Sequence, residues 1–381
     1  MTDTAAVLVE RIHRNGPIRF GAFVDVALSG PGGFFTRGGG AGRAGRDFVT
    51  SPEVGSLFGV CVARALDAEW VRQGRPDPFV VVEAGAGNGR LARDVLRAAP
   101  ACAPALHYVL VERSLHLRAE QATRLPLEPV ADALGPAIRS APGDTPEPVT
   151  GLGPVVGALD ELPARPVDGV VLANELLDNL PFEIAVRTED GWDEVRVGVA
   201  DDGTFTEIRV PATDDLTRWL ADVDAAPGTR LPVATGAVEW IAAAASVLHR
   251  GSLLLLDYTA EWHALVARAG GWLRTYAGHA RGGHPLAAPG TQDVTIDVPI
   301  EMIRHAAARA SLVPGSEGSQ AAWLAGLGID ELVAEGRARW EAGAAAPDLE
   351  ALAGRSRISE AAALTDPYGL GAHTVLTFRT G

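Results

Sequence analysis

The sequence contains no lysine, so every basic side chain apart from histidine is an arginine. Without a lysine amine the chain cannot form a Schiff base or build the phosphate-binding loop of P-loop proteins. Only two cysteines are present, Cys61 and Cys102, which excludes a disulfide framework and a thiolate metal cage. The histidines show no metal-ligand spacing, and we therefore expect no metal site.

Long hydrophobic runs and an excess of positive charge are also missing. The longest apolar stretch, around residues 241–248, is far shorter than the roughly 20 residues that cross a bilayer. The first residues include acids and no long apolar core, unlike a signal peptide. We therefore expect a soluble cytoplasmic protein with no membrane partner. The net charge of −15 argues against a nucleic-acid partner.

What is present is the pattern of an α/β protein. From about residue 78 the sequence alternates between apolar, β-branched runs and helical segments, which predicts a parallel sheet. Three alternating runs separated by the Asp-Gly turns 190–191 and 202–203 predict a β-meander. The expected strands are 79–83, 107–112, one within 154–163, one within 167–181, 252–258 and a final edge strand at 373–379. The expected helices are 91–98, 115–124 and 236–249, besides one ending near residue 28.

This pattern suggests a division into four regions. Residues 1–75 are expected to form N-terminal helices with a glycine-rich lid at 29–48, a segment too long for an ordinary turn. Residues 76–258 are expected to form the core, with the meander inserted at 182–210. We expect a helical cap over the substrate at 259–360 and the last core strand within 361–381.

The sharpest local signal is a glycine turn after the first buried strand. Gly85, Gly87 and Gly89 precede a helix, where glycines allow positive φ and a close backbone approach to a ligand at the helix N-terminus. Arg90 stands where a dinucleotide-binding sequence carries its third glycine. The turn alone is compatible with NAD, FAD or S-adenosylmethionine.

Two carboxylates favour S-adenosylmethionine among these ligands. Glu83 lies just before the turn, where a carboxylate suits the ammonium of an amino-acid-type ligand better than a pyrophosphate. Glu112 ends the second strand, where it can accept hydrogen bonds from both ribose hydroxyls. We therefore expect a methyl donor rather than a dinucleotide at this turn.

Longer segments resemble the MidA family of methyltransferases, which includes the mitochondrial complex I assembly methyltransferase. The resemblance runs almost end to end, and its most specific parts are DFVTSPEVGSLFG (47–59) and LANELLDNLPFE (172–183). It implies a class I, Rossmann-like core of seven strands with S-adenosylmethionine as the cofactor. The mitochondrial relatives methylate an arginine of a complex I subunit, which implies a protein arginine as the acceptor.

Further donor-side candidates lie at element ends. Thr50, Ser51 and Glu53 begin a helix that would face the site, although they could equally serve as helix caps. Asp160 follows the third strand and could bind the adenine amine, with simple loop solvation as the alternative. Asn174 ends the fourth strand and could hold the methionine end of the donor or the substrate.

The acceptor-side candidates follow the fourth and fifth strands. Glu175 and Asp178 are three residues apart and would share one side of a helical turn, where they could grip a guanidinium or act as a base. The alternative is that they cap this turn and bond arginines of the lid. Tyr258 would form a wall of the site or pack as a core aromatic. Tyr276 and His279 would contact the substrate from the cap, with His279 as a second candidate base.

Other functions remain open at this point. The acceptor could be a small molecule methylated on a carboxylate or hydroxyl, with Arg37, Arg43 or His279 orienting the anion. The chain could instead be a non-catalytic assembly factor that binds the donor and a partner protein, or an NAD-dependent oxidoreductase. The expected partner is an acceptor protein or small molecule, with a homodimer as a further option.

Overall fold

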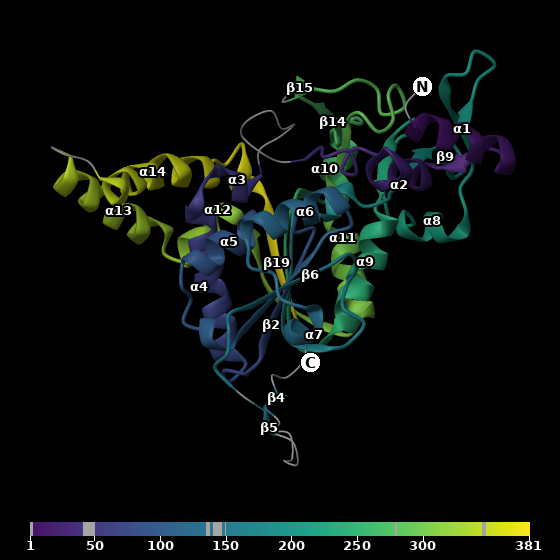
Figure 1. The fold of residues 1–381 in the computed structure, drawn as a ribbon. Coiled ribbons are helices and arrows are strands. Elements are labelled where there is room, and N and C mark those ends of the chain that lie inside the picture. Colours follow the sequence, from purple (N-terminus) through teal and green to yellow (C-terminus); the bar gives the residue numbers. More distant parts are fainter. Residues whose placement is uncertain are drawn as a thin grey trace. The chain divides into compact units, whose positions relative to one another are not determined.

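The computed structural model describes residues 3–40, 50–134, 138–139, 147–148, 150–278, 280–344 and 348–381. The chain forms two compact units, each built from three separate segments. Unit 1 comprises Met1–Phe48, Glu175–Ala243 and Asp257–Ser311, and unit 2 comprises Val49–Asn174, Ala244–Leu256 and Leu312–Gly381. Figure 1 labels the elements of both.

Unit 2 is built on a sheet that has seven strands within the described residues, in the order β18-β19-β12-β7-β2-β3-β6. The five strands from β12 to β6 run parallel, whereas β18 and β19 pair antiparallel. This confirms the expected seven-strand core. The bounds are β2 Phe79–Ala84, β3 Leu106–Val111, β6 Val155–Leu159, β7 Val167–Asn174, β12 Leu248–Asp257, β18 Leu312–Ser319 and β19 Thr374–Thr380.

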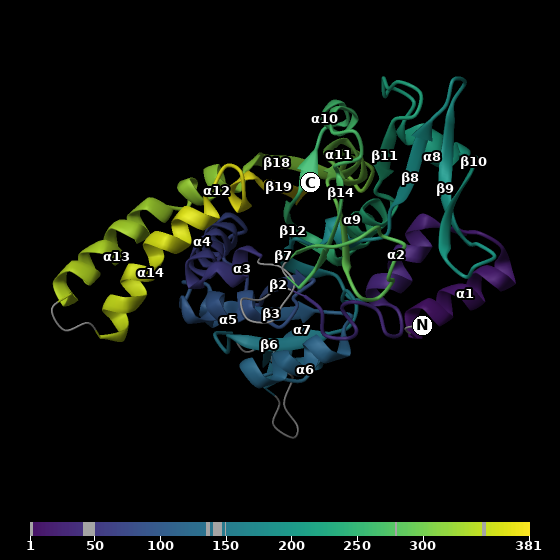
Figure 2. The same ribbon diagram turned by 90° about the horizontal axis from the view of Figure 1, so that it is seen from above.

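Helices complete unit 2. Every residue of β2 and β3 is buried, as their apolar runs predict, and α4 contributes Leu57, Phe58 and Cys61 to the same core. Helices α13 and α14 lie side by side as a hairpin (Figure 2). Their backbones approach closely at two glycines, because a Cβ on Gly354 would come within 2.5 Å of the Gly336 carbonyl oxygen. The helices are α3 Ser51–Val54, α4 Ser56–Arg72, α5 Arg90–Arg97, α6 Leu115–Arg124, α7 Val130–Leu134, α12 Gln320–Gly326, α13 Ile329–Gly343 and α14 Leu349–Leu364. The short elements are η1 Ala103–Ala105, η3 Leu370–Ala372, and β4 Ile138–Arg139 paired with β5 Glu147–Pro148.

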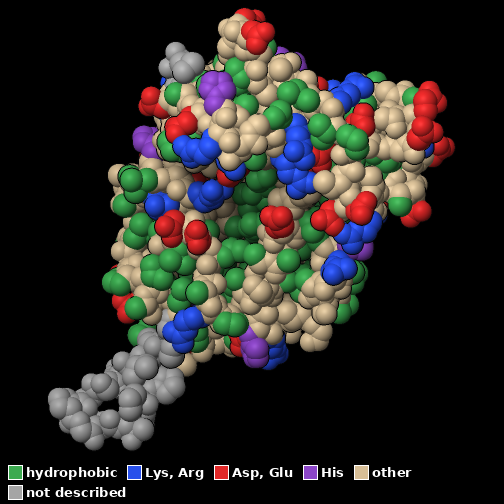
Figure 3. All heavy atoms as spheres, turned by 90° about the vertical axis from the view of Figure 1, so that its right-hand side faces the viewer, with side chains coloured by type: hydrophobic (Ala, Val, Ile, Leu, Met, Phe, Trp, Pro, Cys, Tyr) green, Lys and Arg blue, Asp and Glu red, His purple; other side chains and the backbone are tan. Residues whose placement is uncertain are grey.

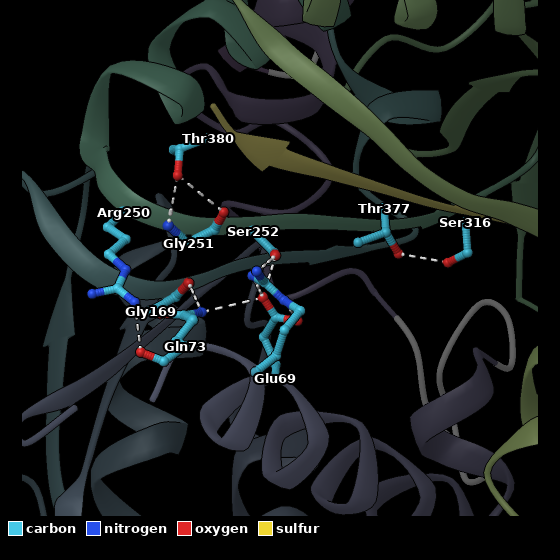
Figure 4. Close-up of polar contacts among 10 residues, drawn as sticks. Glu69, Gln73, Gly169, Arg250, Gly251, Ser252, Ser316, Thr377 and Thr380 are labelled. Carbon is cyan, nitrogen blue, oxygen red and sulfur yellow. Dashed lines mark hydrogen bonds and ion pairs between the residues drawn. The ribbon is translucent and has the colours of Figure 1, made fainter. Parts of the chain in front are cut away.

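A polar cluster fixes the end of α4 to the first residues of β7 and β12 (Figure 4). Gln73 Nε2 donates to the Gly169 carbonyl oxygen at 3.0 Å, and Arg250 Nη2 donates to the Gln73 carbonyl oxygen at 2.8 Å. The Ser252 hydroxyl donates to Glu69 in the same cluster. These contacts occupy the amino ends of the parallel strands, so the carboxyl ends remain as the edge for ligands.

Unit 1 contains the expected meander. Strands β8, β9 and β10 pair antiparallel in sequence order, and β1 and β11 extend the sheet. Helix α2 packs on it through Phe20 and Phe23, whose rings lie 5.4 Å from Phe182 and 5.7 Å from Phe205. The strands are β1 Ile18–Arg19, β8 Glu183–Arg187, β9 Trp192–Val199, β10 Phe205–Pro211 and β11 Arg230–Val233. The helices are α1 Asp3–Asn15, α2 Phe20–Ser29, α8 Asp214–Trp219, α10 Trp262–Ala267 and α11 Ile300–Arg309, and α9 Thr235–Val247 runs from unit 1 into unit 2.

The expectation of a helical cap at 259–360 is wrong in two ways. Part of this region forms a second sheet of unit 1, in which β14 Leu273–Ala277 lies between β15 Ala280–Arg281 and β16 Asp293–Ile296. Residues from Leu312 onward belong to unit 2 and supply β18. A short pair, β13 Thr259–Ala260 and β17 Val298–Pro299, and the 3-10 turn η2 Leu177–Asn179 complete unit 1.

Two further expectations need correction. The final strand is not an edge strand, because β18 flanks β19 on its outer side. The region 1–75 is not one domain either, because the chain passes from unit 1 to unit 2 after Phe48. The sequence does not predict strand β18, because its residues, LVPGSEGS, do not alternate between apolar and polar. Only Leu312 in this strand is buried.

The described part of the expected lid, residues 30–40, folds onto unit 1 as a series of turns. Phe34 is buried, and its N–H donates to the Ala27 carbonyl oxygen of α2 at 2.9 Å. Arg37 is exposed on this segment, whereas Arg43 lies outside the described residues. Across the part of the chain that the structure describes, no helix is long and apolar enough to cross a membrane, and no group of three or more His, Cys, Asp or Glu side chains could hold a metal ion.

Candidate functional site

The glycine turn joins β2 to α5 in unit 2. Gly85, Gly87 and Gly89 have φ of 69°, 52° and 77°, all in the left-handed region that favours glycine. A Cβ added to Gly87 would meet no described atom within 4 Å. The turn therefore presents backbone to an open space, as the sequence pattern predicts for a ligand-binding turn.

Glu112 follows β3 directly and faces this turn. Its Oε2 accepts a hydrogen bond from the Gly87 N–H at 3.0 Å, and its Oε1 accepts one from the Ser114 N–H at 2.8 Å. Burial raises the pKa of Glu112, while these backbone donors oppose the rise. Each carboxylate oxygen keeps a second lone pair, so the half-buried group can still accept bonds from two ligand hydroxyls.

Unlike Glu112, which bonds the glycine turn, Glu83 lies inside the core at the end of β2. Its side chain is buried, and its Oε2 accepts a hydrogen bond from the Tyr108 hydroxyl on β3 at 2.7 Å. Burial raises the pKa of Glu83 to about 8, although the Tyr108 hydrogen bond opposes this rise. Glu83 therefore links β2 to β3 beneath the turn, a role that the sequence alone does not reveal.

The raised pKa of Glu83 predicts a pH-dependent stability. The carboxyl ionises near pH 4.5 in an unfolded chain but near 8 in the folded protein, so its contribution to stability is fully present below pH 4.5 and is lost as pH rises through 8. The full effect is at most about 5 kcal/mol. Glu83→Gln keeps an acceptor for Tyr108 but cannot ionise. We expect the fall in Tm between about pH 6 and about pH 8.5 to be smaller in this variant than in the wild type.

The matched control for this prediction is Glu189→Gln, because Glu189 is exposed in the turn between β8 and β9. Thermal unfolding followed by circular dichroism at both pH values provides the measurement. Identical pH profiles for wild type and Glu83→Gln would show that Glu83 is already ionised in the folded protein.

The helix-start candidates are held by structural contacts. Thr50 is the N-cap residue of α3, and its side chain makes no capping hydrogen bond. The Ser51 hydroxyl donates to Gln320 Oε1 on α12 at 2.9 Å, and both side chains are buried. Glu53 Oε2 lies 3.2 Å from Arg90 Nη1, so this carboxylate ties α3 to the start of α5. Ser51 and Glu53 thus position α3 beside the glycine turn.

The remaining donor-side candidates also end strands of the sheet. Asp160 is exposed immediately after β6, and Asn174 is the half-buried last residue of β7. Because β2, β3, β6 and β7 run parallel, Glu112, Asp160 and Asn174 lie along the same edge as the glycine turn. The structure therefore brings these three residues to the ligand-binding edge of unit 2.

Two residues of α6 hold the turn and were missed by sequence reasoning. Gln121 Nε2 donates to the Gly87 carbonyl oxygen at 2.7 Å, and Arg124 Nη1 donates to the Asn88 carbonyl oxygen at 2.9 Å. They are three residues apart on a helix, so they face the same side. That spacing was the available signal, but nothing in the sequence shows which loop the pair would meet.

The acceptor-side candidates belong to unit 1. Glu175 directly follows Asn174 in the chain and has φ of 51°, an uncommon left-handed conformation for a residue other than glycine. It precedes η2, so it does not share a helical turn with Asp178 as the sequence spacing suggested. Such strained backbone is concentrated at functional sites, and here it sets the direction of the Glu175 side chain.

Asp178 is buried next to a second carboxyl, that of Asp257. Asp178 Oδ2 accepts a hydrogen bond from the Thr295 hydroxyl at 2.5 Å, whereas Asp257 Oδ2 accepts from the Leu177 N–H at 2.7 Å. Burial raises the pKa of both carboxyls, and the Asp178 carboxylate further raises that of Asp257. The two groups form a buried acid pair that holds η2, and Asp257 was not among the expected site residues.

Aromatic and cationic side chains lie around this pair. The Arg274 guanidinium carbon is 5.3 Å from the centre of the Tyr258 ring, and burial raises the pKa of Tyr258, with a further contribution from the Glu175 carboxylate. Tyr276 is half-buried on β14, with Arg281 5.8 Å above its ring. His279 lies outside the described residues. Glu175, Asp178 and Tyr258 are thus electrostatic neighbours, as expected for parts of one site.

Comparisons with known proteins decide the chemistry. The model of a family of S-adenosyl-L-methionine-dependent methyltransferases matches residues 61–315, more than half of the chain. The chain belongs to this family. The methyltransferase is 28% identical to the Drosophila melanogaster protein arginine methyltransferase NDUFAF7 homolog over 80% of the chain and 69% of the relative. It is 29% identical to the mitochondrial protein arginine methyltransferase NDUFAF7 of Mus musculus over 85% and 73%.

A solved structure agrees with this assignment. The methyltransferase resembles a Burkholderia thailandensis protein crystallised with S-adenosyl-homocysteine, with a TM-score of 0.80 and 30% identity over 99% of this chain and 91% of that chain. The resemblance to the MidA family, the class I core and the cofactor S-adenosylmethionine are thereby confirmed. The methyltransferase uses that donor, and the comparisons do not favour the NAD-dependent alternative.

Proposed function

We propose that this methyltransferase transfers the methyl group of S-adenosylmethionine to an arginine side chain of a protein. The observation that carries the proposal is the similarity to protein arginine methyltransferases from insects to mammals over at least 80% of the chain. A group of carboxylates in unit 1 supports it, because carboxylates bind guanidinium groups through paired, charge-assisted hydrogen bonds.

On the donor side we assign roles to residues at the carboxyl edge of the unit 2 sheet. The residues fit the donor, since the Gly87 position leaves an open space and Glu112 retains acceptor capacity. We propose that Glu112 accepts the ribose hydroxyls, that the glycine turn lets its backbone approach the nucleoside, and that Asp160 and Asn174 bind its adenine and methionine ends. In this arrangement Ser51 and Glu53 act as positioning residues.

On the acceptor side the residues must bind the guanidinium and accept the proton that it loses. The bound donor supplies an electrophilic methyl carbon on a sulfonium. As an arginine nitrogen forms the new bond to this carbon, the sulfur keeps the electron pair of the broken bond, and the nitrogen must lose one proton. We propose that Glu175 binds the guanidinium, and that Glu175 or the Asp178–Asp257 pair takes this proton. Alignment for in-line displacement supplies the remainder of catalysis.

Radiolabelled S-adenosylmethionine added to a lysate of the host, with and without the purified protein, tests the proposal. We expect label in the protein fraction, and acid hydrolysis should release it as methylated arginine. Label confined to small molecules would overturn the protein acceptor, and label on another amino acid would overturn arginine. A protein carrying Gly87→Leu serves as the control, since it should not use the donor.

A further inference from the structure

Unit 1 contains a pocket of about 400 Å³ between Arg230 at the start of β11, Glu207 on β10, and the residues in and around β14 and β15. Its charged lining consists of Arg230, Arg274, Arg281 and Glu207, with His284 at its side. We propose that this pocket binds an anion, a carboxylate or phosphate group of a ligand other than the methyl donor. The proposal does not depend on arginine being the methyl acceptor.

The balance of charge in the pocket favours an anion. Arg230 and Glu207 neutralise each other through two hydrogen bonds of 2.8 Å each. Arg274 and Arg268 both bond the Asp297 carboxylate, and Arg274 also lies close enough to Asp178 to oppose the rise in the pKa of that carboxyl. Arg281 therefore remains as the lining arginine without a carboxylate partner among the described residues, in a protein whose net charge is −15. An anionic ligand would pair with this charge.

Arg281 is the most accessible of these cations. On the face shown in Figure 3, arginines are interspersed with aspartates and glutamates. Arg281 differs from that pattern, because its guanidinium lies over the Tyr276 ring and has no carboxylate partner among the described residues. Because no carboxylate engages this guanidinium, its N–H donors are available to a ligand.

Arg274 forms part of the wall of the pocket. Its Nη1 donates to Asp297 Oδ1 at 2.7 Å, whereas its Nη2 is buried with no acceptor among the residues the structure describes. Gly270, Gly282 and Gly283 line the pocket without side chains, so a ligand can approach the backbone closely.

The size of the pocket limits the ligand class. A volume of about 400 Å³ lies within the range of about 300–1,000 Å³ typical of small-molecule sites and exceeds what a single inorganic ion fills. The anion can therefore come from two sources with the same chemistry: an acidic side chain of the acceptor protein, or a free organic acid or phosphate ester. Both would be held by paired bonds to arginine.

The test uses the full-length protein and defined probes. Inorganic phosphate and succinate represent free anions. The peptide acetyl-Ala-Arg-Ala-Glu-Ala-amide, compared with the same peptide carrying Gln for Glu, represents an acidic side chain of a protein. Binding is measured by calorimetry for wild type, Arg281→Ala, Arg281→Lys and the matched control Arg14→Ala, which removes an exposed arginine of α1 in the same unit.

We expect at least one anion to bind wild type and Arg14→Ala alike, with about tenfold weaker binding to Arg281→Ala and partial recovery in Arg281→Lys. Tighter binding of the Glu peptide than of the Gln peptide identifies the acceptor protein as the source, whereas binding of succinate or phosphate alone identifies a free anion. The proposal is overturned if no probe binds, or if Arg281→Ala and Arg14→Ala change affinity equally. S-adenosyl-homocysteine binding by every variant shows that each is folded, and it separates this result from the proposed methyl transfer.

Discussion

Replacing Gly87 by leucine is expected to abolish binding of S-adenosylmethionine and S-adenosyl-homocysteine, with a loss of at least about 100-fold in affinity. Gly87 has φ of 52° and presents open space at the glycine turn, so a leucine side chain would occupy the volume assigned to the donor. The left-handed conformation also costs roughly 1–2 kcal/mol for a residue with a Cβ. The measurement is the rise in Tm caused by S-adenosyl-homocysteine, which wild type should show and NAD should not produce.

The control must carry the same backbone strain without touching the donor. Gly203, in the turn between β9 and β10, has φ of 83°, and a Cβ there would also meet no described atom within 4 Å. We expect Gly203→Leu to lower the Tm by a similar amount but to keep the full stabilisation by S-adenosyl-homocysteine. If Gly87→Leu also keeps it, the donor does not lie at this turn.

Glu175→Gln is expected to reduce the rate of methyl transfer by about 100-fold or more while leaving donor binding intact. The substitution keeps the size of the side chain and its left-handed backbone but removes the negative charge that would hold the guanidinium. Because the donor residues belong to unit 2 and Glu175 to unit 1, the two measurements should separate cleanly. The assay is incorporation of labelled methyl groups into the acceptor protein found in the lysate experiment.

Glu189→Gln provides the matched comparison, since it makes the same change at an exposed position of unit 1. It should transfer methyl groups at the wild-type rate. Unchanged turnover in Glu175→Gln would remove this residue from the acceptor site and leave its backbone conformation as a purely structural feature. A loss of S-adenosyl-homocysteine binding in Glu175→Gln would point to disturbance of the neighbouring Asn174 instead.

The core of unit 2 was predictable because its signals are local. The strands β2 and β3 are mostly apolar and rich in valine, and the three glycines of the turn adopt the positive φ that their spacing suggests. Glu112 was also predictable in position, since a residue at the end of a parallel strand must lie at the carboxyl edge. In each case the residues of one short segment were sufficient for the prediction.

The rest depends on contacts between distant segments. The hydrogen bond from Tyr108 to Glu83 and the pairing of Asp178 with Asp257 join residues far apart in sequence, and neither has a spacing that reveals it. Strand β18 has almost no buried side chains, so its assignment comes from pairing with β19 and not from its composition. If β18 is not recognised, the sequence pattern predicts that β19 is an edge strand and that the region before it forms a helical cap.

The order of the last strands has a consequence for synthesis of the protein. In the chain β18 precedes β19, but in the sheet β19 is inserted between β12 and β18. Strand β12 contains a run of leucines. While the chain is emerging from the ribosome, β12 has no strand to pair with on the side that β19 will later cover. We expect the nascent chain to need a chaperone, or to delay closure of the sheet, until β19 has emerged.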